Sequence, residues 1–191
     1  PGTQSAYSAI LYGFIIKKVI ECATNMHFNA VFKKYLIVML GLEGRAHLGL
    51  PTGAKNYCTN IHDFETNEIV APTYFWKMLP LMQNQSIPSV NGYFTAEALA
   101  KVFGVVACGG SYLNKDSIDS LCKMHHIGYD TVVGLTMKKS VGLMIDLYPG
   151  TVGHGGINGN IAFAHKEKHL GVAILINTLK VDHEMVNKLC D

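Results

Sequence analysis

The stretch 153–160, Gly-His-Gly-Gly-Ile-Asn-Gly-Asn, holds the residue types of this chain that best suit a binding site. Glycine-rich backbone lets a ligand approach the edge of a strand closely, because no side chains stand in the way. His154 adds a titratable ring beside that backbone. Its glycine neighbours offer no apolar packing, so a purely structural role for His154 is the weaker interpretation. Gly155, Gly156 and Gly159 also fit a tight strand entry or a bulge, which does not exclude a binding role.

The first nine residues, Pro-Gly-Thr-Gln-Ser-Ala-Tyr-Ser-Ala, carry the second group of interest, the phenol of Tyr7. Taken alone, a tyrosine at the start of a helix is better explained by a half-buried ring whose hydroxyl reaches water. Together with the glycine-rich stretch, it resembles the second and third signature blocks of the serine β-lactamase-like hydrolases. Tyr7-Ser8-Ala9 is similar to the Tyr-x-Asn of the second block. His154-Gly155-Gly156 is similar to the Lys-Thr-Gly of the third block or its histidine variant.

The resemblance extends over nearly the whole chain and corresponds to the C-terminal part of class C β-lactamases and their esterase relatives. The two blocks have the family's order and separation, with further matches at Asn91-Gly92, Thr95-Ala96 and Asn177. The resemblance implies acyl transfer, in which the serine of a Ser-x-x-Lys block attacks a small-molecule ester or amide and an oxyanion hole holds the negative charge. It implies no cofactor and no metal.

The resemblance also implies roles for individual residues. Tyr7 would lie near the nucleophile and relay its proton, and His154 would replace the lysine that steadies this tyrosine and contacts the substrate. The backbone N–H of Ile157 would be one oxyanion donor. Gly155 and Gly156 would border the substrate.

Three departures from the family's pattern leave two functions open. Ala9 replaces an asparagine whose amide would bind the catalytic lysine and the substrate, and His154 replaces the lysine of true β-lactamases, which favours an esterase-like substrate. The nucleophile block is missing before Tyr7, and the match at Ser120-Leu121-Cys122-Lys123 lies between the other two blocks, so we interpret it as coincidence. The chain is expected to be part of a serine hydrolase whose nucleophile lies upstream of Pro1, or an inactive binding or scaffold protein of the same fold.

The remaining polar residues have simpler interpretations. Asn91 either lines the substrate cleft or forms only a turn with the glycine that follows it. The adjacent His125 and His126 would point apart in a helix or a strand, whereas His165 and His169 flank a charged hairpin tip. None of these histidines is placed to share a metal ion, so no metal site is predicted.

Periodicity and turn residues predict the elements that must position these groups. Helices are expected over Ala9–Cys22 with Asn25 as a left-handed stop, from the cap Thr95 to Gly109-Gly110, from Asp116 or Ser117 to Cys122, and over about Asp182–Leu189. The first helix is expected to bury a face made of Leu11, Phe14, Ile15, Val19 and Cys22. Strands are expected at Thr131–Thr136, Val141–Leu147, Ile161–Ala164 and Leu170–Asn177. The last is nearly all apolar, which predicts a central strand covered on both faces.

These elements predict one partial domain over residues 1–191, mainly helical over 1–127, with antiparallel strands and a C-terminal helix over 128–191. The fold class is α/β of the α+β type, with an antiparallel sheet flanked by helices. The resemblance implies a β-lactamase/transpeptidase-like fold whose N-terminal strands and nucleophile helix are missing from this chain. A sheet that lacks those strands leaves an apolar edge exposed, so we expect this chain alone to self-associate.

Composition and charge exclude several other functions. The net charge is only +2 and basic residues form no run longer than a pair, so no footprint for nucleic acid is present. Uncharged apolar stretches such as 10–16 and 102–113 fall short of the about 20 apolar residues that a membrane helix needs. The five cysteines are scattered and never spaced C-x-x-C, which predicts reduced thiols. Nothing in the sequence indicates the compartment.

Overall fold

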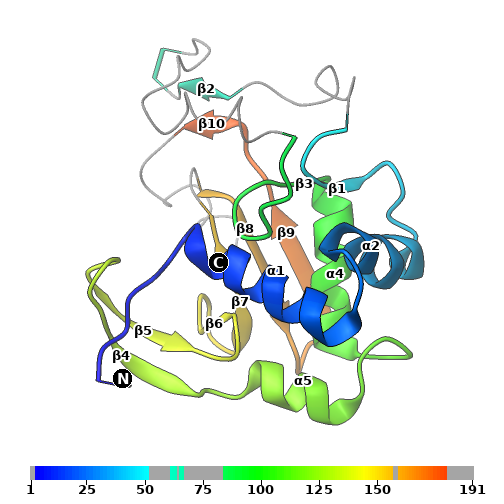
Figure 1. Cartoon of the computed structure of the whole chain (residues 1–191). Coiled ribbons are helices and arrows are strands. Elements are labelled where there is room, and N and C mark those ends of the chain that lie inside the picture. Colours follow the sequence, from blue (N-terminus) through cyan, green and yellow to red (C-terminus); the bar gives the residue numbers. More distant parts are fainter. Residues whose placement is uncertain (1–2, 52–60, 64, 67–83, 157–158, 180–191) are drawn as a thin grey trace. The chain divides into compact units, whose positions relative to one another are not determined.

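The computed structural model describes residues 3–51, 61–63, 65–66, 84–156 and 159–179 (Figure 1). The described residues form two compact units. The first unit combines residues 3–8 with 99–176, and the second combines residues 9–98 with 177–179. Within the described residues, no helix has both the length and the apolar character needed to cross a membrane.

The first unit is built on a six-stranded sheet in which every neighbouring pair is antiparallel, as predicted. The strands follow one another in chain order: β4 (His126–Asp130), β5 (Leu135–Lys139), β6 (Met144–Ile145), β7 (Thr151–Gly155), β8 (Ile161–His165) and β9 (Leu170–Ile174). Sequential hairpins of this kind need only short turns between their strands.

The strand predictions are confirmed in part. The strand expected at Ile161–Ala164 is β8, whereas the one expected over Val141–Leu147 shortens to the two residues of β6. The strand expected at Thr131–Thr136 begins only at Leu135, as β5, because residues 131–134 form the turn between β4 and β5. The carboxylate of Asp130 accepts backbone N–H groups inside this turn, and Gly134 has the positive φ of 77° that closes it.

The centre of the sheet also differs from the prediction. Four residues of β8 are buried, including Ala164 with no exposed surface, and β8 pairs with strands on both sides. Within the described residues β9 pairs with β8 alone, so it lies at the edge and its residues are only partly buried. Its apolar composition therefore reflects contacts on its two faces rather than a central position.

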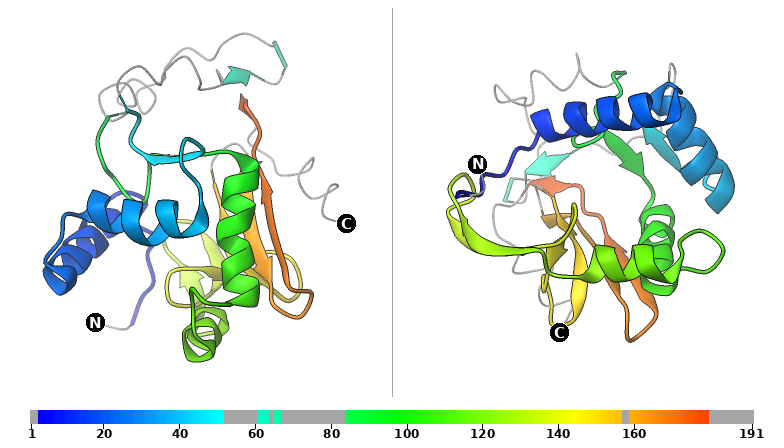
Figure 2. Two further views of the ribbon diagram at one scale, coloured as in Figure 1. Left: turned by 90° about the vertical axis from the view of Figure 1, so that its right-hand side faces the viewer. Right: turned by 60° about the horizontal axis from the view of Figure 1, so that its bottom comes forward.

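Helix α4 (Ala96–Cys108) covers one face of the sheet, and in Figure 2 it runs alongside β9. The helix and strand approach closely because both lack side chains at the contact. A Cβ added at Gly171 would lie 2.2 Å from the backbone nitrogen of Gly104. Beside this contact Ala107 packs on Val152 and Ala164, and these three form the buried core of this face.

The opposite face of the sheet carries a second buried pair, Ile161 and Phe163, which packs against Leu147, Tyr148, Val172 and Ile174. Side chains alternate between the faces along β8, so consecutive residues belong to different cores. The sheet is therefore apolar on both faces, which explains why β8 reads as a continuous apolar run.

Capping residues fix both helices of this part of the chain. The hydroxyl of Thr95 accepts the N–H of Ala98 at 3.1 Å, as predicted for the start of α4, and Gly109 has a left-handed φ of 70° at its end. Helix α5 (Lys115–Cys122) begins one residue earlier than expected, because the side chain of Asn114 caps it by accepting the N–H of Ser117 at 2.8 Å.

The second unit holds α1 (Leu11–Thr24), α2 (Phe28–Phe32), the π-helical segment η1 (Lys33–Val38) and four short strands. Strand β1 (Ala46–Leu48) pairs antiparallel with β3 (Gly92–Phe94), and β2 (His62–Asp63) pairs in parallel with β10 (Thr178–Leu179). Helix α1 ends at Asn25 with a φ of 50°, which confirms the left-handed stop. The helix expected over Asp182–Leu189 and most of the loop region expected up to Tyr74 lie outside the described residues.

The predicted burial of α1 is wrong. Its apolar side chains face solvent: Leu11 is 67% exposed, Ile15 62% and Val19 57%. The buried residue of α1 is Gly13, where an added Cβ would lie 2.4 Å from the hydroxyl of Ser89. The described part of the second unit thus contacts α1 along a narrow line through Gly13 and leaves the wide apolar face uncovered.

Candidate active site

The ring of His154 projects from β7 near the end of that strand. His154 lies opposite Ala162 of β8 and is half-buried. Its Nδ1 atom lies 2.6 Å from the carbonyl oxygen of Gly155. A carbonyl only accepts hydrogen bonds, so this contact places the proton of a neutral ring on Nδ1. The Nε2 atom is then the acceptor that the ring offers to other groups.

Tyr7 lies beside this histidine although the two residues are far apart in the sequence. The ring centroids are 5.9 Å apart and the ring planes are tilted by 37°. Both residues belong to the first unit. A phenol and an imidazole thus meet at the end of β7, which is the arrangement that the resemblance implies for the two blocks.

The segment that carries Tyr7 is held by the hairpin of β4 and β5. In Figure 1 this dark blue segment runs beside the hairpin, and Ser5 forms a parallel bridge with Asp130. The carboxylate of Asp130 accepts the backbone N–H of Tyr7 at 3.0 Å. Asp130 has no exposed surface and also pairs with Lys139 at 2.5 Å. Sequence reasoning missed this contact, because nothing local in the sequence links residue 7 to residue 130.

The glycines next to His154 have different functions. A Cβ at Gly153 would lie 2.2 Å from the carbonyl oxygen of Ala162 and 2.6 Å from the Cα of Phe163, so this glycine is required for strand packing. A Cβ at Gly155 would have no heavy atom within 4 Å. Open space beside exposed backbone is what a ligand at a strand edge needs. Gly156 donates its N–H to the backbone carbonyl of Asn160 at 2.6 Å, which continues the hairpin.

Two other predicted site residues stay predictions. Ile157, expected to be an oxyanion donor, lies outside the described residues. Asn91 belongs to the second unit and is only 3% exposed. Its side-chain oxygen accepts the N–H of Ile87 at 3.0 Å and its amide group donates to the carbonyl of Gln85. These bonds account for Asn91 as a turn residue, and a substrate contact through it stays a prediction.

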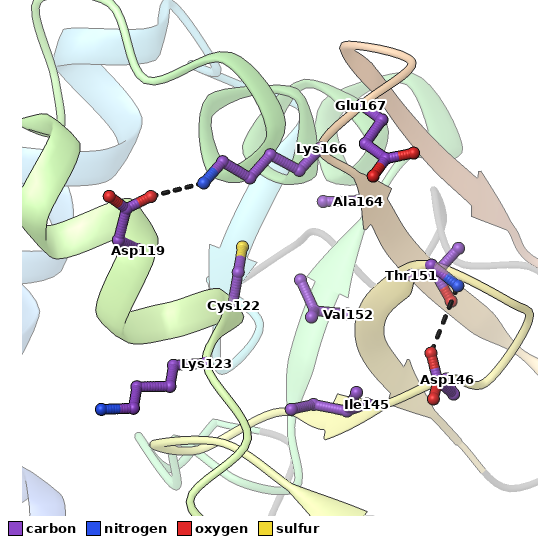
Figure 3. A pocket seen from close by; sticks show the side chains of 11 residues that line it. Asp119, Cys122, Lys123, Ile145, Asp146, Thr151, Val152, Ala164, Lys166 and Glu167 are labelled. Atoms are coloured by element: carbon purple, nitrogen blue, oxygen red, sulfur yellow. Dashed lines mark hydrogen bonds and ion pairs between the residues drawn. The ribbon is translucent and has the colours of Figure 1, made fainter.

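A separate cavity of about 340 Å³ lies near the other end of β7 (Figure 3). Thr151 and Val152 line it, together with residues of α5 and of the turn after β8, whereas Tyr7 and His154 do not. In Figure 3 the ammonium group of Lys166 is directed at Asp119. Hydrogen bonds from Lys115 and Lys166 lower the pKa of Asp119 to about 2.

The groups in this cavity are poorly suited to nucleophilic catalysis. Burial raises the pKa of the Cys122 thiol, which disfavours the reactive thiolate.

Ser120 of the Ser-x-x-Lys match is exposed near the end of α5, and its backbone carbonyl contacts the His125 ring at 3.2 Å. Neither this serine nor Lys123 is paired with the Tyr7 and His154 rings. Within the described residues, no group of three His, Cys, Asp or Glu side chains is arranged to hold a metal ion.

Comparison with known proteins identifies the relatives of this chain. The Beta-lactamase family profile matches residues 1–189. Esterase/beta-lactamase LipL of Mycobacterium tuberculosis is 23% identical over 92% of this chain and 49% of its own length. The chain thus spans about half the length of this curated relative.

Solved structures share the fold. A family VIII carboxylesterase superposes with a TM-score of 0.77 at 21% identity, covering 95% of this chain and 55% of the esterase. A penicillin-binding protein homologue from Caulobacter crescentus gives a TM-score of 0.75 at 21% identity, covering 93% and 54%. The D-amino acid amidase of Ochrobactrum anthropi SV3 gives 0.70 at 14% identity, covering 98% and 56%. Because the family match covers nearly the entire sequence, this chain belongs to the beta-lactamase family of hydrolases.

Proposed function

We propose that this chain forms the C-terminal portion of a serine hydrolase that cleaves small-molecule esters or amides by acyl transfer. The single observation that supports this proposal most is the approach of the Tyr7 and His154 rings to 5.9 Å. In this proposal the nucleophilic serine lies outside the chain, in a Ser-x-x-Lys block of the complete protein. The matched esterases and amidases favour substrates of these two classes.

The chemistry assigned to the two rings is proton transfer. The serine oxygen bonds to the substrate carbonyl carbon while the serine proton passes to the oxygen of Tyr7 and the phenol proton passes to Nε2 of His154. Reversal of this relay then delivers a proton to the departing alcohol or amine and returns both rings to their starting state. Water completes the cycle by hydrolysing the acyl-enzyme. His154 holds the phenol, because its Nδ1 is engaged by Gly155 and its Nε2 stays available as an acceptor.

Substrate is proposed to lie along the end of β7. The open space at Gly155 admits it beside the strand, and Gly156 and the backbone N–H of Ile157 follow along the chain. The N–H of Ile157 would stabilise the oxyanion. An imidazole in place of a lysine offers less fixed positive charge, so esters without a carboxylate are the preferred substrates.

A second candidate is a binding or scaffold protein without catalysis. Ala9 favours it, because its methyl group can neither accept nor donate the hydrogen bonds that an asparagine amide would make there. In this case small molecules would bind beside Gly155 without being cleaved.

Labelling of the full-length gene product with a fluorophosphonate and turnover of a p-nitrophenyl ester test the first candidate. Tyr7→Phe should lower the acylation rate by about 10²–10⁴-fold, the usual contribution of a positioned proton-transfer group. Tyr129→Phe is the matched control, since Tyr129 belongs to the same unit and is 61% exposed. Absence of labelling in the unmodified protein, or equal labelling in the Tyr7→Phe variant, would refute the proposed mechanism.

A further inference from the structure

The carboxylate of Asp130, which has no exposed surface, lies at the centre of a polar cluster that no catalytic role yet explains. From this cluster we propose that Asp130, paired with Lys139, is a positioning residue that fixes Tyr7 against His154. The inference rests on the proposed function in assigning catalysis to Tyr7. Residues 5–7 are attached to the β4–β5 hairpin whether or not Tyr7 takes part in catalysis.

The first part of the cluster is the turn that follows Asp130. One carboxylate oxygen, Oδ1, accepts the N–H groups of Val132 and Val133 at 3.0 Å each. The carbonyl of Asp130 accepts the N–H of Gly134 at 2.8 Å. These bonds make the carboxylate part of a rigid turn, because they fix its position relative to the hairpin backbone.

The second part is the segment that carries Tyr7. The same Oδ1 atom accepts the N–H of Tyr7 at 3.0 Å, and Oδ2 accepts the hydroxyl of Ser5 at 3.3 Å. The carbonyl of Ser5 in turn accepts the N–H of Thr131 at 3.0 Å. Ser5 and Tyr7 make hydrogen bonds to Asp130, Thr131 and Lys139. Asp130 therefore contributes the bond that lies closest to the phenol ring.

The third part is the countercharge. The ammonium group of Lys139 lies 2.5 Å from Oδ2 of Asp130 and 2.7 Å from the hydroxyl of Ser5, so it bridges the hairpin and the segment. The hydrogen bond from Lys139, supported by the N–H groups of Val133, Tyr7 and Val132, holds the pKa of Asp130 well below its usual range in spite of burial. The carboxylate stays ionised and keeps its acceptors available.

The consequence for the site is geometric. With the N–H of Tyr7 fixed at Asp130, two side-chain torsions remain to set the ring, and the contact with His154 selects one arrangement. A shift of about 1 Å in a catalytic group is enough to lower a rate about 10²-fold. Asp130 touches neither His154 nor the proposed substrate path in any described contact, so its effect on catalysis has to pass through Tyr7.

A double-mutant cycle on the full-length gene product tests this dependence with a p-nitrophenyl ester. Asp130→Asn should lower kcat by about 10–100-fold with little change in KM, because the phenol is displaced while the binding edge remains. In the Tyr7→Phe background the same substitution should lower kcat less than about threefold. Asp119→Asn, which removes another carboxylate paired with lysines in this unit, is the matched control and should leave kcat unchanged.

Two further results would contradict the positioning role while leaving the proposed function intact. One is an Asp130→Asn variant with unchanged kcat, and the other is an equal loss of kcat in both backgrounds. Failure of Tyr7→Phe to lower kcat would instead refute the proposed function. If Asp130→Asn does not fold, Lys139→Met should lower kcat and Lys139→Arg should restore it, because arginine preserves the ion pair. Equal activity of these two variants would overturn the proposal.

A spectroscopic measurement tests the attachment without catalysis. The ring protons of His154 experience the ring current of Tyr7 at a centroid distance of 5.9 Å. In NMR spectra Asp130→Asn should move the His154 ring signals toward their positions in a Tyr7→Ala variant, whereas Asp119→Asn should leave them in place. Unmoved signals in Asp130→Asn would show that Asp130 does not hold Tyr7.

Discussion

The two ends of β7 differ in what surrounds them. Near its start Val152 is 5% exposed and packs against Ala107 and Ala164, and Gly153 has backbone atoms where a side chain would be. At its end His154 is half-buried beside Tyr7, and Gly155 faces open space. One strand thus changes from packed core to accessible backbone within three residues. The packed half holds the other half in place, as a preorganised site requires.

The same difference distinguishes two of the carboxylates that pair with lysines in this unit, Asp130 and Asp119. Asp130 is fully buried and holds the segment that carries Tyr7. Asp119 is partly exposed and lies beside the cavity near the start of β7. Both are ionised and both have lysine partners, but only the first is linked to the candidate site.

The largest expected effect is at the packed end of the strand. Gly153→Ala should destabilise the protein by about 3 kcal/mol, because the added methyl group would overlap the backbone of β8, which cannot move without breaking its pairing. Urea denaturation of the variant and the wild type measures this difference. A variant of wild-type stability would show that β7 and β8 are not packed as closely as described.

The second prediction concerns acid and the two carboxylates. Both have folded-state pKa values below the ordinary value of 3.8, so each stabilises the fold above about pH 4 and loses that contribution as the pH falls, for Asp119 through about 2. Thermal unfolding between about pH 5 and pH 2 should show decreasing stability, and Asp130→Asn should flatten this dependence.

Asp119→Asn is the comparison for the acid experiment. Its effect should be smaller and should disappear in high salt, since Asp119 and its lysines are partly exposed and solvent screens their attraction. If the two substitutions changed the pH dependence of stability equally, the buried ion pair of Asp130 would not differ from the exposed ion pairs of Asp119.

The third prediction concerns the open end of the strand. Gly155→Ala should change the free energy of unfolding by less than about 1 kcal/mol, because the methyl group meets no other atom. It should nevertheless lower kcat/KM for an ester substrate by about tenfold or more, since it narrows the proposed approach to the backbone. Enzyme assays and urea denaturation on the same preparation separate the two effects. Unchanged kcat/KM would exclude this edge as the substrate path.

The smallest effect is expected from the exposed face of α1. Leu11, Ile15 and Val19 present an apolar surface, so this 191-residue chain should self-associate in sedimentation experiments. Ile15→Lys should shift the distribution toward monomer, whereas Lys18→Glu on the same helix should not. A wild-type chain that sediments as a monodisperse monomer would refute this expectation.

Local signals in the sequence were sufficient for the parts that depend on neighbouring residues. Thr95 and Asn25 mark helix ends because capping and left-handed geometry are set by a few adjacent atoms. The apposition of Tyr7 and His154 was predicted from the family resemblance rather than from any property of the two residues alone. No sequence period or spacing links them.

Features that depend on residues far apart in the sequence could not be predicted from local signals. An apolar run such as that of β9 has the same composition at an edge as at the centre of a sheet, because burial on two faces does not require two neighbouring strands. The stripe of α1 indicates that a face is suited to burial but does not indicate what covers it. Asp130 binds Tyr7 across the fold, and its own neighbours suggest only a turn.

In the proposed mechanism the phenol of Tyr7 and the imidazole of His154 act as one catalytic unit. The most direct measurement is a double-mutant cycle of Tyr7→Phe and His154→Gln on kcat/KM for a p-nitrophenyl ester, with the full-length gene product. The loss of kcat/KM caused by the second substitution should be at least tenfold smaller once the first is present, a coupling of about 1.4 kcal/mol. Fully additive losses, or no loss from either substitution, would contradict it.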